Sequence, residues 1–280
     1  MTDPIALCLG GSLSPQVAVM RAVLNGADPR DLSARLVAET GERAAELRRL
    51  LGHEAAVEKL RATVAAGGID HTAEGLPALE MLRAAFDRAV SVSPEASVAA
   101  YSLGDASTLQ CATAELVGFL TDRDLLHPGQ RVLDIGCGIG RVAATVAPKV
   151  ASVVGIDISA GMIAEACRRN RDSATLHFEL TPGTGLSDRL GRFDLILGVD
   201  SFPYLVQAGV AARHVADAAR LLRGGGALVI FNLSYRGLEY DRAIVREWCN
   251  ASGFQLCCDG ERPLNLWDAA VFIMRRPAGS

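Results

Sequence analysis

One short run of residues constrains the fold of this 280-residue chain more than any other. Residues 131–141 read Arg-Val-Leu-Asp-Ile-Gly-Cys-Gly-Ile-Gly-Arg, an apolar strand that carries Asp134 and leads into three alternating glycines. Glycine has no Cβ, so such a turn accepts positive φ angles and lets a ligand approach the backbone. The residues from Arg141 to Ala147 predict a helix whose first N–H groups face the same ligand. The run therefore predicts a strand–turn–helix unit that binds a small molecule.

Further strands and helices follow this turn and predict the fold class. We expect strands at 131–135, 152–157, 174–180, 193–199 and 226–232, with helices at 139–147, 160–170, 206–222 and 238–252 between them. Alternation of this kind is typical of a parallel sheet with helices on both faces. Strands at 254–259 and 269–275 follow each other without a helix, so we expect them to pair antiparallel.

The N-terminal part has a different, helical pattern. Ser14-Pro15 and Ser93-Pro94 each read as an N-cap residue followed by proline in the first turn. Apolar residues keep helical spacing between these two sites, and strand patterns are almost absent before Arg131. We expect residues 1–95 to form a helical cap or oligomerisation domain, and residues 96–280 to form the ligand-binding domain. A homodimer through the N-terminal helices is one expectation.

Composition excludes several function classes. Half of the residues are hydrophobic and 21% are charged, as in a globular domain with a good core. A net charge of −4 argues against a nucleic-acid partner. No apolar run reaches the ~18–20 residues that a membrane span needs, and the N-terminus lacks the basic start of a secretory signal, so we expect no membrane partner and a cytoplasmic location. The seven cysteines show neither C-x-x-C pairs nor metal-ligand spacing, so we expect reduced thiols and no metal.

A second acid supports the interpretation of the glycine-rich turn as part of a ligand-binding site. Asp157 ends the next buried strand, where a neighbouring strand end can meet a ribose. Asp134, the three glycines and Asp157 together resemble motif I and the following strand of the class I S-adenosylmethionine (SAM) methyltransferases of small-molecule type. Dinucleotide enzymes carry G-x-G-x-x-G instead and need no acid inside the strand, which makes a nicotinamide cofactor the weaker alternative.

The resemblance spans about residues 130–276 and implies a fold and a cofactor. The fold is α/β: a Rossmann-like, seven-stranded, mostly parallel sheet with a C-terminal antiparallel hairpin, preceded by the helical N-terminal domain. The cofactor is SAM, and the product is S-adenosylhomocysteine. By analogy with the family, Asp134, Gly136 and Gly138 hold the methionyl end. The cofactor-binding residues that the resemblance implies are Tyr101, Asp134, Gly136, Cys137, Gly138, Asp157, Ile158, Met162, Thr181 and Val199.

Several of these assignments have alternatives. Asp157 either accepts both ribose hydroxyls or caps the following helix, and Met162 either encloses the adenine or belongs to the helix core. The family often carries an acid after the third strand, whereas this chain has Thr181, so Thr181 or the backbone meets the adenine amine. Tyr101 is either a lid residue over SAM or an interdomain packing residue.

The residues after the fourth strand predict the acceptor side of the site. Methyltransferases reach the transferring methyl group from this position, and here the chain reads Val-Asp-Ser-Phe-Pro-Tyr. Three roles are open for Asp200: a general base, a residue that orients the substrate, or the cap of the next helix. We assign Asp200 and Tyr204 to catalysis. Ser-Phe-Pro-Tyr only imperfectly resembles the Asn-Pro-Pro-Tyr motif of enzymes that methylate planar nitrogens. We expect Phe202, Tyr235 and Arg236 to bind the acceptor, with Arg236 suited to an acidic group.

These assignments predict a SAM-dependent methyltransferase that acts on an oxygen or nitrogen atom of a small molecule. Because the sulfonium is already activated, the protein mainly supplies alignment and a dry site. Two alternatives remain: another SAM-using transfer, such as aminocarboxypropyl transfer, or a non-catalytic SAM-binding protein that acts through partners.

Overall fold

The computed structural model describes residues 3–279 and divides them into two compact units. The helical unit contains the described residues up to Gly68 together with 88–115 and 264–268. The sheet unit contains 69–87, 116–263 and the described residues from Ala269 onward. Residues 69–87, which the sequence places in the N-terminal helical domain, thus belong to the sheet unit. The sequence predicts two folding domains, at 1–95 and 96–280, and a dimer through the N-terminal helices. Both remain predictions.

The helices that lie within the helical unit are mostly short, and several of them begin at side-chain caps. They are α1 (Pro4–Leu9), α2 (Pro15–Leu24), α3 (Pro29–Arg35), α4 (Glu42–Leu51), α5 (Glu54–Gly67), α7 (Pro94–Val98) and the single turn Ala100–Ser102. The helix starts predicted at Ser14 and Ser93 are confirmed: each hydroxyl accepts a backbone N–H of the first turn, and proline follows. Such caps satisfy N–H groups that a helix leaves without a partner.

A loop from the C-terminal hairpin completes the helical unit. Asp268 accepts hydrogen bonds from the Ser14 backbone N–H at 3.1 and 3.0 Å, one to each carboxylate oxygen. The Tyr101 ring stacks on Trp267, with centroids 5.4 Å apart and planes 14° from parallel. Sequence reasoning had no signal for these contacts, because they join residues far apart in the chain.

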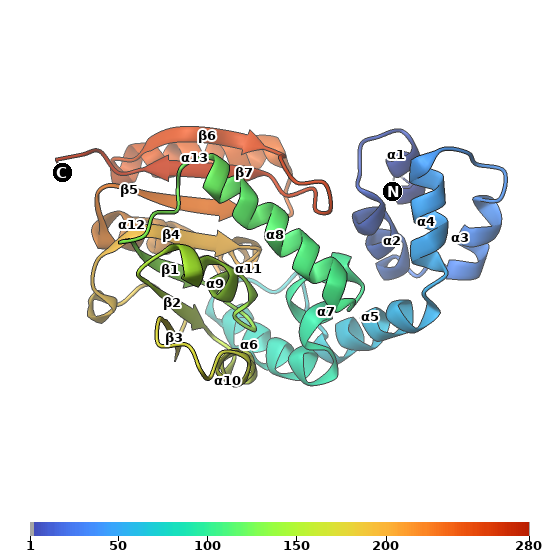
Figure 1. The fold of residues 1–280 in the computed structure, drawn as a ribbon, viewed down its shortest axis with the longest axis horizontal. Coiled ribbons are helices and arrows are strands. Elements are labelled where there is room, and N and C mark those ends of the chain that lie inside the picture. Colours follow the sequence, from blue (N-terminus) through green and yellow to red (C-terminus); the bar gives the residue numbers. More distant parts are fainter. Residues whose placement is uncertain (1–2, 280) are drawn as a thin grey trace. The chain divides into compact units, whose positions relative to one another are not determined.

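The sheet unit contains seven strands, coloured from green to red in Figure 1. They are β1 (Arg131–Ile135), β2 (Ser152–Asp157), β3 (Leu176–Leu180), β4 (Phe193–Val199), β5 (Leu222–Phe231), β6 (Gln255–Glu261) and β7 (Val271–Arg275). Their order is β3-β2-β1-β4-β5-β7-β6, with β1 to β5 parallel and β7 antiparallel to both of its neighbours. This arrangement confirms the predicted fold class and the terminal hairpin.

Two helices, α6 (Gly75–Val92) and α8 (Ala106–Asp122), precede β1 and each run through both units. The helices that follow strands of the sheet are α9 (Arg141–Val146), α10 (Ala160–Arg169), α11 (Phe202–Gln207), α12 (Ala211–Leu221) and α13 (Leu238–Ser252). Helices α9 and α10 contact β2, whereas α12 and α13 contact β5 and β6 respectively, and each other. Crossovers between parallel strands are right-handed, and they run in opposite directions from β1 and from β4. They therefore place α9 and α10 on one face of the sheet and α12 and α13 on the other.

One predicted element was wrong. The sequence pattern predicted a single helix over 206–222, but the structure has two helices, α11 and α12, and β5 begins already at Leu222. Pro203 lies in the first turn of α11, where its missing N–H costs nothing, so the helix starts earlier. Gly209, at φ 70°, separates the two helices. Leu222 pairs with Phe193 in the sheet, which ends α12.

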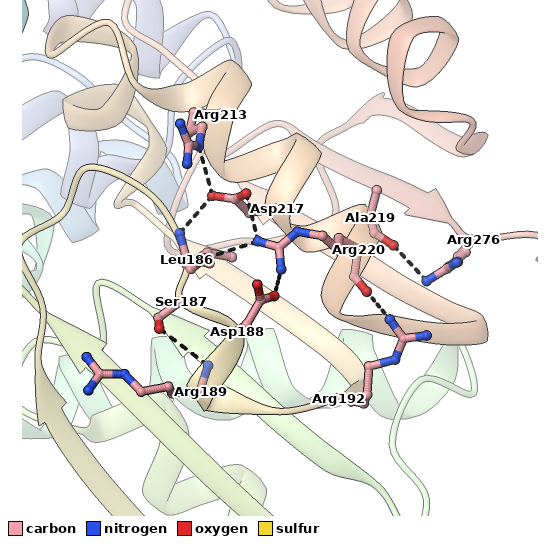
Figure 2. A network of polar contacts seen from close by, with 10 residues as sticks. All are labelled: Leu186, Ser187, Asp188, Arg189, Arg192, Arg213, Asp217, Ala219, Arg220 and Arg276. Atoms are coloured by element: carbon pink, nitrogen blue, oxygen red, sulfur yellow. Dashed lines mark hydrogen bonds and ion pairs between the residues drawn. The ribbon is translucent and has the colours of Figure 1, made fainter.

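A polar network fixes the loop between β3 and β4 to α12 (Figure 2). The buried Asp217 accepts hydrogen bonds from the Leu186 backbone N–H at 2.9 Å and from Arg220 Nη2 at 3.0 Å. Arg220, in α12, also forms an ion pair with Asp188 of the loop. A Cβ added to Gly185 would lie 2.7 Å from the Asp217 carboxylate. The loop is therefore closely packed on the buried Asp217 carboxylate, which joins it to α12.

Candidate active site

The glycine-rich turn lies at the point where the sheet changes direction. From β1 the chain continues toward β2, and from β4 it continues toward β5 on the other side. Open α/β sheets bind ligands at such a switch point, at the carboxyl ends of the strands, here those of β1 and β4. Gly136, after β1, has φ 69°, and an added Cβ would lie 2.4 Å from Ser201 Cβ after β4. An added Cβ at Gly140 would lie 2.8 Å from the Phe178 ring. Close protein contacts, besides any ligand, thus require glycine here.

Asp157 holds the turn in shape. Its Oδ2 accepts the Gly138 N–H at 2.9 Å, and its Oδ1 accepts the Ser159 N–H at 2.9 Å. The helix cap itself is Ser159, whose Oγ accepts the Met162 N–H at 3.0 Å. Burial raises the pKa of Asp157, while these two backbone N–H groups oppose the rise. Since each carboxylate oxygen has a second lone pair, Asp157 keeps acceptor capacity beyond these two bonds.

Asp134 is a buried acid with an unused acceptor. The residue is 1% exposed, and its Oδ2 has no hydrogen-bond partner within the described part of the chain. Burial raises the pKa of Asp134 to about 7; the Arg141 guanidinium opposes the rise, and Asp157 adds to it. A buried acceptor without a donor is costly unless a ligand satisfies it. This atom fits a cationic donor such as an ammonium group.

Asp134→Asn is expected to stabilise the ligand-free protein at pH 8 by about 1–3 kcal/mol. The native pKa near 7 exceeds the ordinary value of 3.8, so the native state holds the proton more tightly than the unfolded state does. This acid therefore lowers stability as the pH rises from about 4 to 7, and asparagine removes that loss. Thermal unfolding of both proteins at pH 5 and pH 8 tests the sign. A gain equal at both pH values would assign it to packing instead.

The loop after β4 places a third acid, Asp200, near the glycine-rich turn. Asp200 adopts φ 58°, donates its N–H to the Phe231 carbonyl at 3.0 Å and accepts Asn232 Nδ2 on Oδ1 at 2.7 Å. Burial raises the pKa of Asp200 to about 6, and Asn232 and Arg141 limit the rise. No side chain caps α11, so in this structure Asp200 does not act as the helix cap. Asp200 is therefore an acid whose ionisation changes at a pH of about 6.

An aromatic wall, formed by Phe86, Tyr204, Tyr235 and His71, lies beside Asp200. The Tyr204 ring meets Phe86 and Tyr235 edge to face, at centroid distances of 5.0 and 6.3 Å. His71 meets Tyr235 in the same manner at 6.0 Å. Tyr235 is 59% exposed, while its hydroxyl reaches Asp200 and Tyr204. Burial and the Asp200 charge raise the pKa of Tyr204, so its hydroxyl remains a proton donor.

The structure places the other predicted cofactor residues as follows. Met162, Cys137 and Val199 are buried, and burial raises the pKa of the Cys137 thiol. Ile158 and Thr181 stay partly exposed. Tyr101 belongs to the helical unit, where it stacks on Trp267. The cofactor roles of these residues remain predictions.

Of the predicted acceptor residues, Phe202 has no exposed surface. A Cβ added to Gly198 would lie 2.5 Å from its ring, so Phe202 packs on the β4 backbone as part of the core. Arg236 donates to the Tyr240 hydroxyl at 3.2 Å and pairs with Glu74 at 3.6 Å. Tyr204 and Tyr235 therefore contribute to the wall in this geometry, whereas Phe202 belongs to the hydrophobic core.

Sequence reasoning missed several residues of the site. Asn232 orients Asp200, Arg141 acts electrostatically on both Asp134 and Asp200, and Phe86 and His71 complete the aromatic wall. Only Asn232 had a usable signal, since it follows β5 just as Asp200 follows β4. In residues 3–279, no three His, Cys, Asp or Glu side chains are grouped to hold a metal ion. Within the same range no helix is long and apolar enough to cross a membrane.

Comparison with known proteins finds similarity to methyltransferases over part of the chain. Residues 132–226 match the model of a family described as a methyltransferase domain. This segment contains β1, the glycine-rich turn, Asp157 and the Asp200 loop. Over this segment the chain is thus similar to methyltransferase domains.

Individual relatives are similar over part of their length. A 2-methyl-6-phytyl-1,4-hydroquinone methyltransferase from Synechocystis is 28% identical, covering 53% of this chain and 39% of the relative. The methyltransferase GfsG from Streptomyces halstedii is 32% identical, covering 48% and 49%. This chain thus spans half or less of the length of these two curated relatives. A SAM-dependent methyltransferase structure from Clostridium acetobutylicum shares the fold, with a TM-score of 0.51, 13% identity, and coverage of 62% of this chain and 93% of that one.

Proposed function

We propose that this protein binds SAM at the carboxyl ends of β1 and β4 and transfers the methyl group to an oxygen or nitrogen atom of a small-molecule acceptor. One observation carries the proposal: Asp134 and Asp157 surround the glycine-rich turn, and Asp200 lies in the neighbouring loop, which touches that turn through Gly136 and Ser201. Two acids suited to the methionyl ammonium group and to the ribose of the cofactor thus lie next to a third acid suited to the acceptor.

The donor set of the turn fits SAM. The spare lone pairs of Asp157 suit two adjacent ribose hydroxyls, because its other lone pairs already hold the turn. The unpartnered Asp134 Oδ2 suits the ammonium group of the methionyl end. Ile158 and Thr181 remain accessible beside the ribose position and suit the adenine. When bound, SAM supplies an activated methyl group on a sulfonium.

The acceptor side supplies alignment and proton removal. Asp200 accepts the acceptor proton, because a carboxylate with a pKa near 6 is ionised at pH 7 yet basic enough to bind that proton transiently. Tyr204 donates its hydroxyl hydrogen and, with the wall, fixes the acceptor's orientation. Arg236, at the rim beside Glu74, selects an acidic group on the acceptor. The hydroquinone named for the Synechocystis relative supports a small-molecule acceptor.

The purified protein is expected to bind SAM and S-adenosylhomocysteine in the micromolar range and NAD far more weakly. An acid inside the strand suits the ammonium end of SAM, whereas a dinucleotide offers only a pyrophosphate there. Isothermal titration calorimetry with all three compounds measures this difference. NAD binding as tight as SAM binding would contradict the assignment.

Product analysis then distinguishes the possible reactions. Methyl transfer releases S-adenosylhomocysteine, whereas aminocarboxypropyl transfer releases methylthioadenosine. Tight SAM binding without turnover over a broad acceptor panel would instead favour a binding protein without catalysis.

A further inference from the structure

One turn of α6 contacts the loop that follows β2. Asp87 Oδ1 accepts the Ser159 hydroxyl at 2.6 Å and the Gly161 N–H at 2.9 Å. One turn earlier, Arg83 Nε donates to the Ile158 carbonyl at 3.2 Å. Three hydrogen bonds thus tie this turn of α6 to residues 158–161, although more than seventy residues separate the two segments.

Ser159 joins Asp87 to the cofactor-binding acid. Its hydroxyl accepts the Met162 N–H as helix cap, so its own hydrogen is available for Asp87. Its backbone N–H meanwhile binds Asp157 Oδ1, and Asp157 Oδ2 binds Gly138. A continuous series of hydrogen bonds therefore runs from α6 through Ser159 and Asp157 to the glycine-rich turn.

The charge of Asp87 alone does not explain its position. A second carboxylate near Asp157 raises the pKa of Asp157, which disfavours its ionised form. The first turn of α10 compensates, because it offers N–H groups and the positive end of the helix dipole to Asp87. Asp87 therefore contributes to the site by fixing the position of Ser159 and of the residues that are hydrogen-bonded to Ser159.

We propose that Asp87 is a positioning residue of the cofactor site: it holds Ser159 so that Asp157 presents its spare lone pairs to the ribose of SAM. This inference rests on the proposed function. Asp87 belongs to the segment 1–95, which the sequence assigns to a helical cap or oligomerisation domain, and no glycine turn marks it. Its effect should fall on SAM binding, because its hydrogen bonds go to the cofactor loop and none goes to Asp200.

The test compares three variants by calorimetry with SAM and by turnover at saturating SAM. Asp87→Ala is expected to weaken SAM binding on the order of tenfold, as for the loss of hydrogen bonds to a charged acceptor, with kcat nearly unchanged. Asp87→Asn should restore affinity to within about threefold, because the amide oxygen can accept the same two donors. Asp28→Ala is the matched control: Asp28 caps α3 in the helical unit, so its loss lowers stability without changing SAM affinity.

Backbone hydrogen exchange in the ligand-free proteins separates this inference from the proposed function. Asp87→Ala should speed exchange at Gly161 and Met162, and Asp28→Ala should not. Unchanged exchange there, or faster exchange with unchanged SAM affinity, overturns the inference. Absence of SAM binding by the unaltered protein overturns the proposed function and the cofactor role of Asp87 together. If Asp87→Ala does not fold, Asp87→Glu, which moves the acceptor by one methylene, is expected to show the same two effects, smaller in size.

Discussion

Asp200→Asn is expected to lower turnover by roughly two to four orders of magnitude while SAM affinity stays the same, the usual range for loss of a general base. Asparagine keeps an oxygen for Asn232 Nδ2 and tolerates the positive φ of this position. It cannot take a proton from the acceptor. The variant therefore removes the chemistry of Asp200 and preserves its shape.

Stability and turnover, measured on the same sample, decide between the roles of Asp200. Because burial raises its pKa to about 6, the ionised acid lowers the stability of the folded protein above about pH 4, and asparagine removes that loss. The melting temperature at pH 8 should thus stay equal or rise. Near-normal turnover would remove Asp200 from the catalytic residues and leave Asn232 and Tyr204 to orient the acceptor.

The pH dependence of turnover gives an independent control. The unaltered protein should lose activity as the pH falls through about 6, because Asp200 then holds its own proton. Tyr204 contributes no inflection near neutrality, since its raised pKa keeps it protonated. The Asp200→Asn variant should lack the inflection near pH 6. If that inflection persists in the variant, another group causes it.

Local patterns were sufficient to predict most of the sheet. The bounds predicted for β1, β2 and β4 agree with the structure, because buried strands are continuous apolar runs that end abruptly at acids, glycines or polar turns. The same patterns predicted the antiparallel hairpin from the missing helix between its strands. They failed at 206–222, where Gly209 breaks an otherwise uniform helical period.

The site could be predicted only where its residues follow strands. Asp134, Asp157 and Asp200 each lie on or just after a strand of the parallel sheet, so topology alone brings them to one edge. Asp87 and Phe86 lie within a regular helix whose period shows that one face is buried but not what covers it. Their contacts with Ser159 and Tyr204 join distant segments, and only the packed structure reveals them.

Asp157→Ala is expected to cost roughly 2–4 kcal/mol of SAM binding, the value of two charge-assisted hydrogen bonds to the ribose. Sequence reasoning treats Asp157 as a strand-end acid whose loss leaves the ligand-free protein unaffected. The structure changes that expectation, because Asp157 is buried and accepts the Gly138 and Ser159 N–H groups. Alanine leaves both donors without a partner, so stability should fall as well, by about 1–3 kcal/mol.

A matched variant at the opposite edge of the sheet separates binding from stability. Asp194, at the start of β4, also accepts a strand N–H, that of Arg131 at 2.8 Å, and pairs with Arg223. Asp194→Ala should therefore lower the melting temperature without weakening SAM binding, since ligands in such sheets bind at the carboxyl ends of the strands. Calorimetry on both variants, at a temperature where each is fully folded, measures the difference. Equal SAM affinity in the two would show that Asp157 only shapes the turn and that the ribose binds elsewhere.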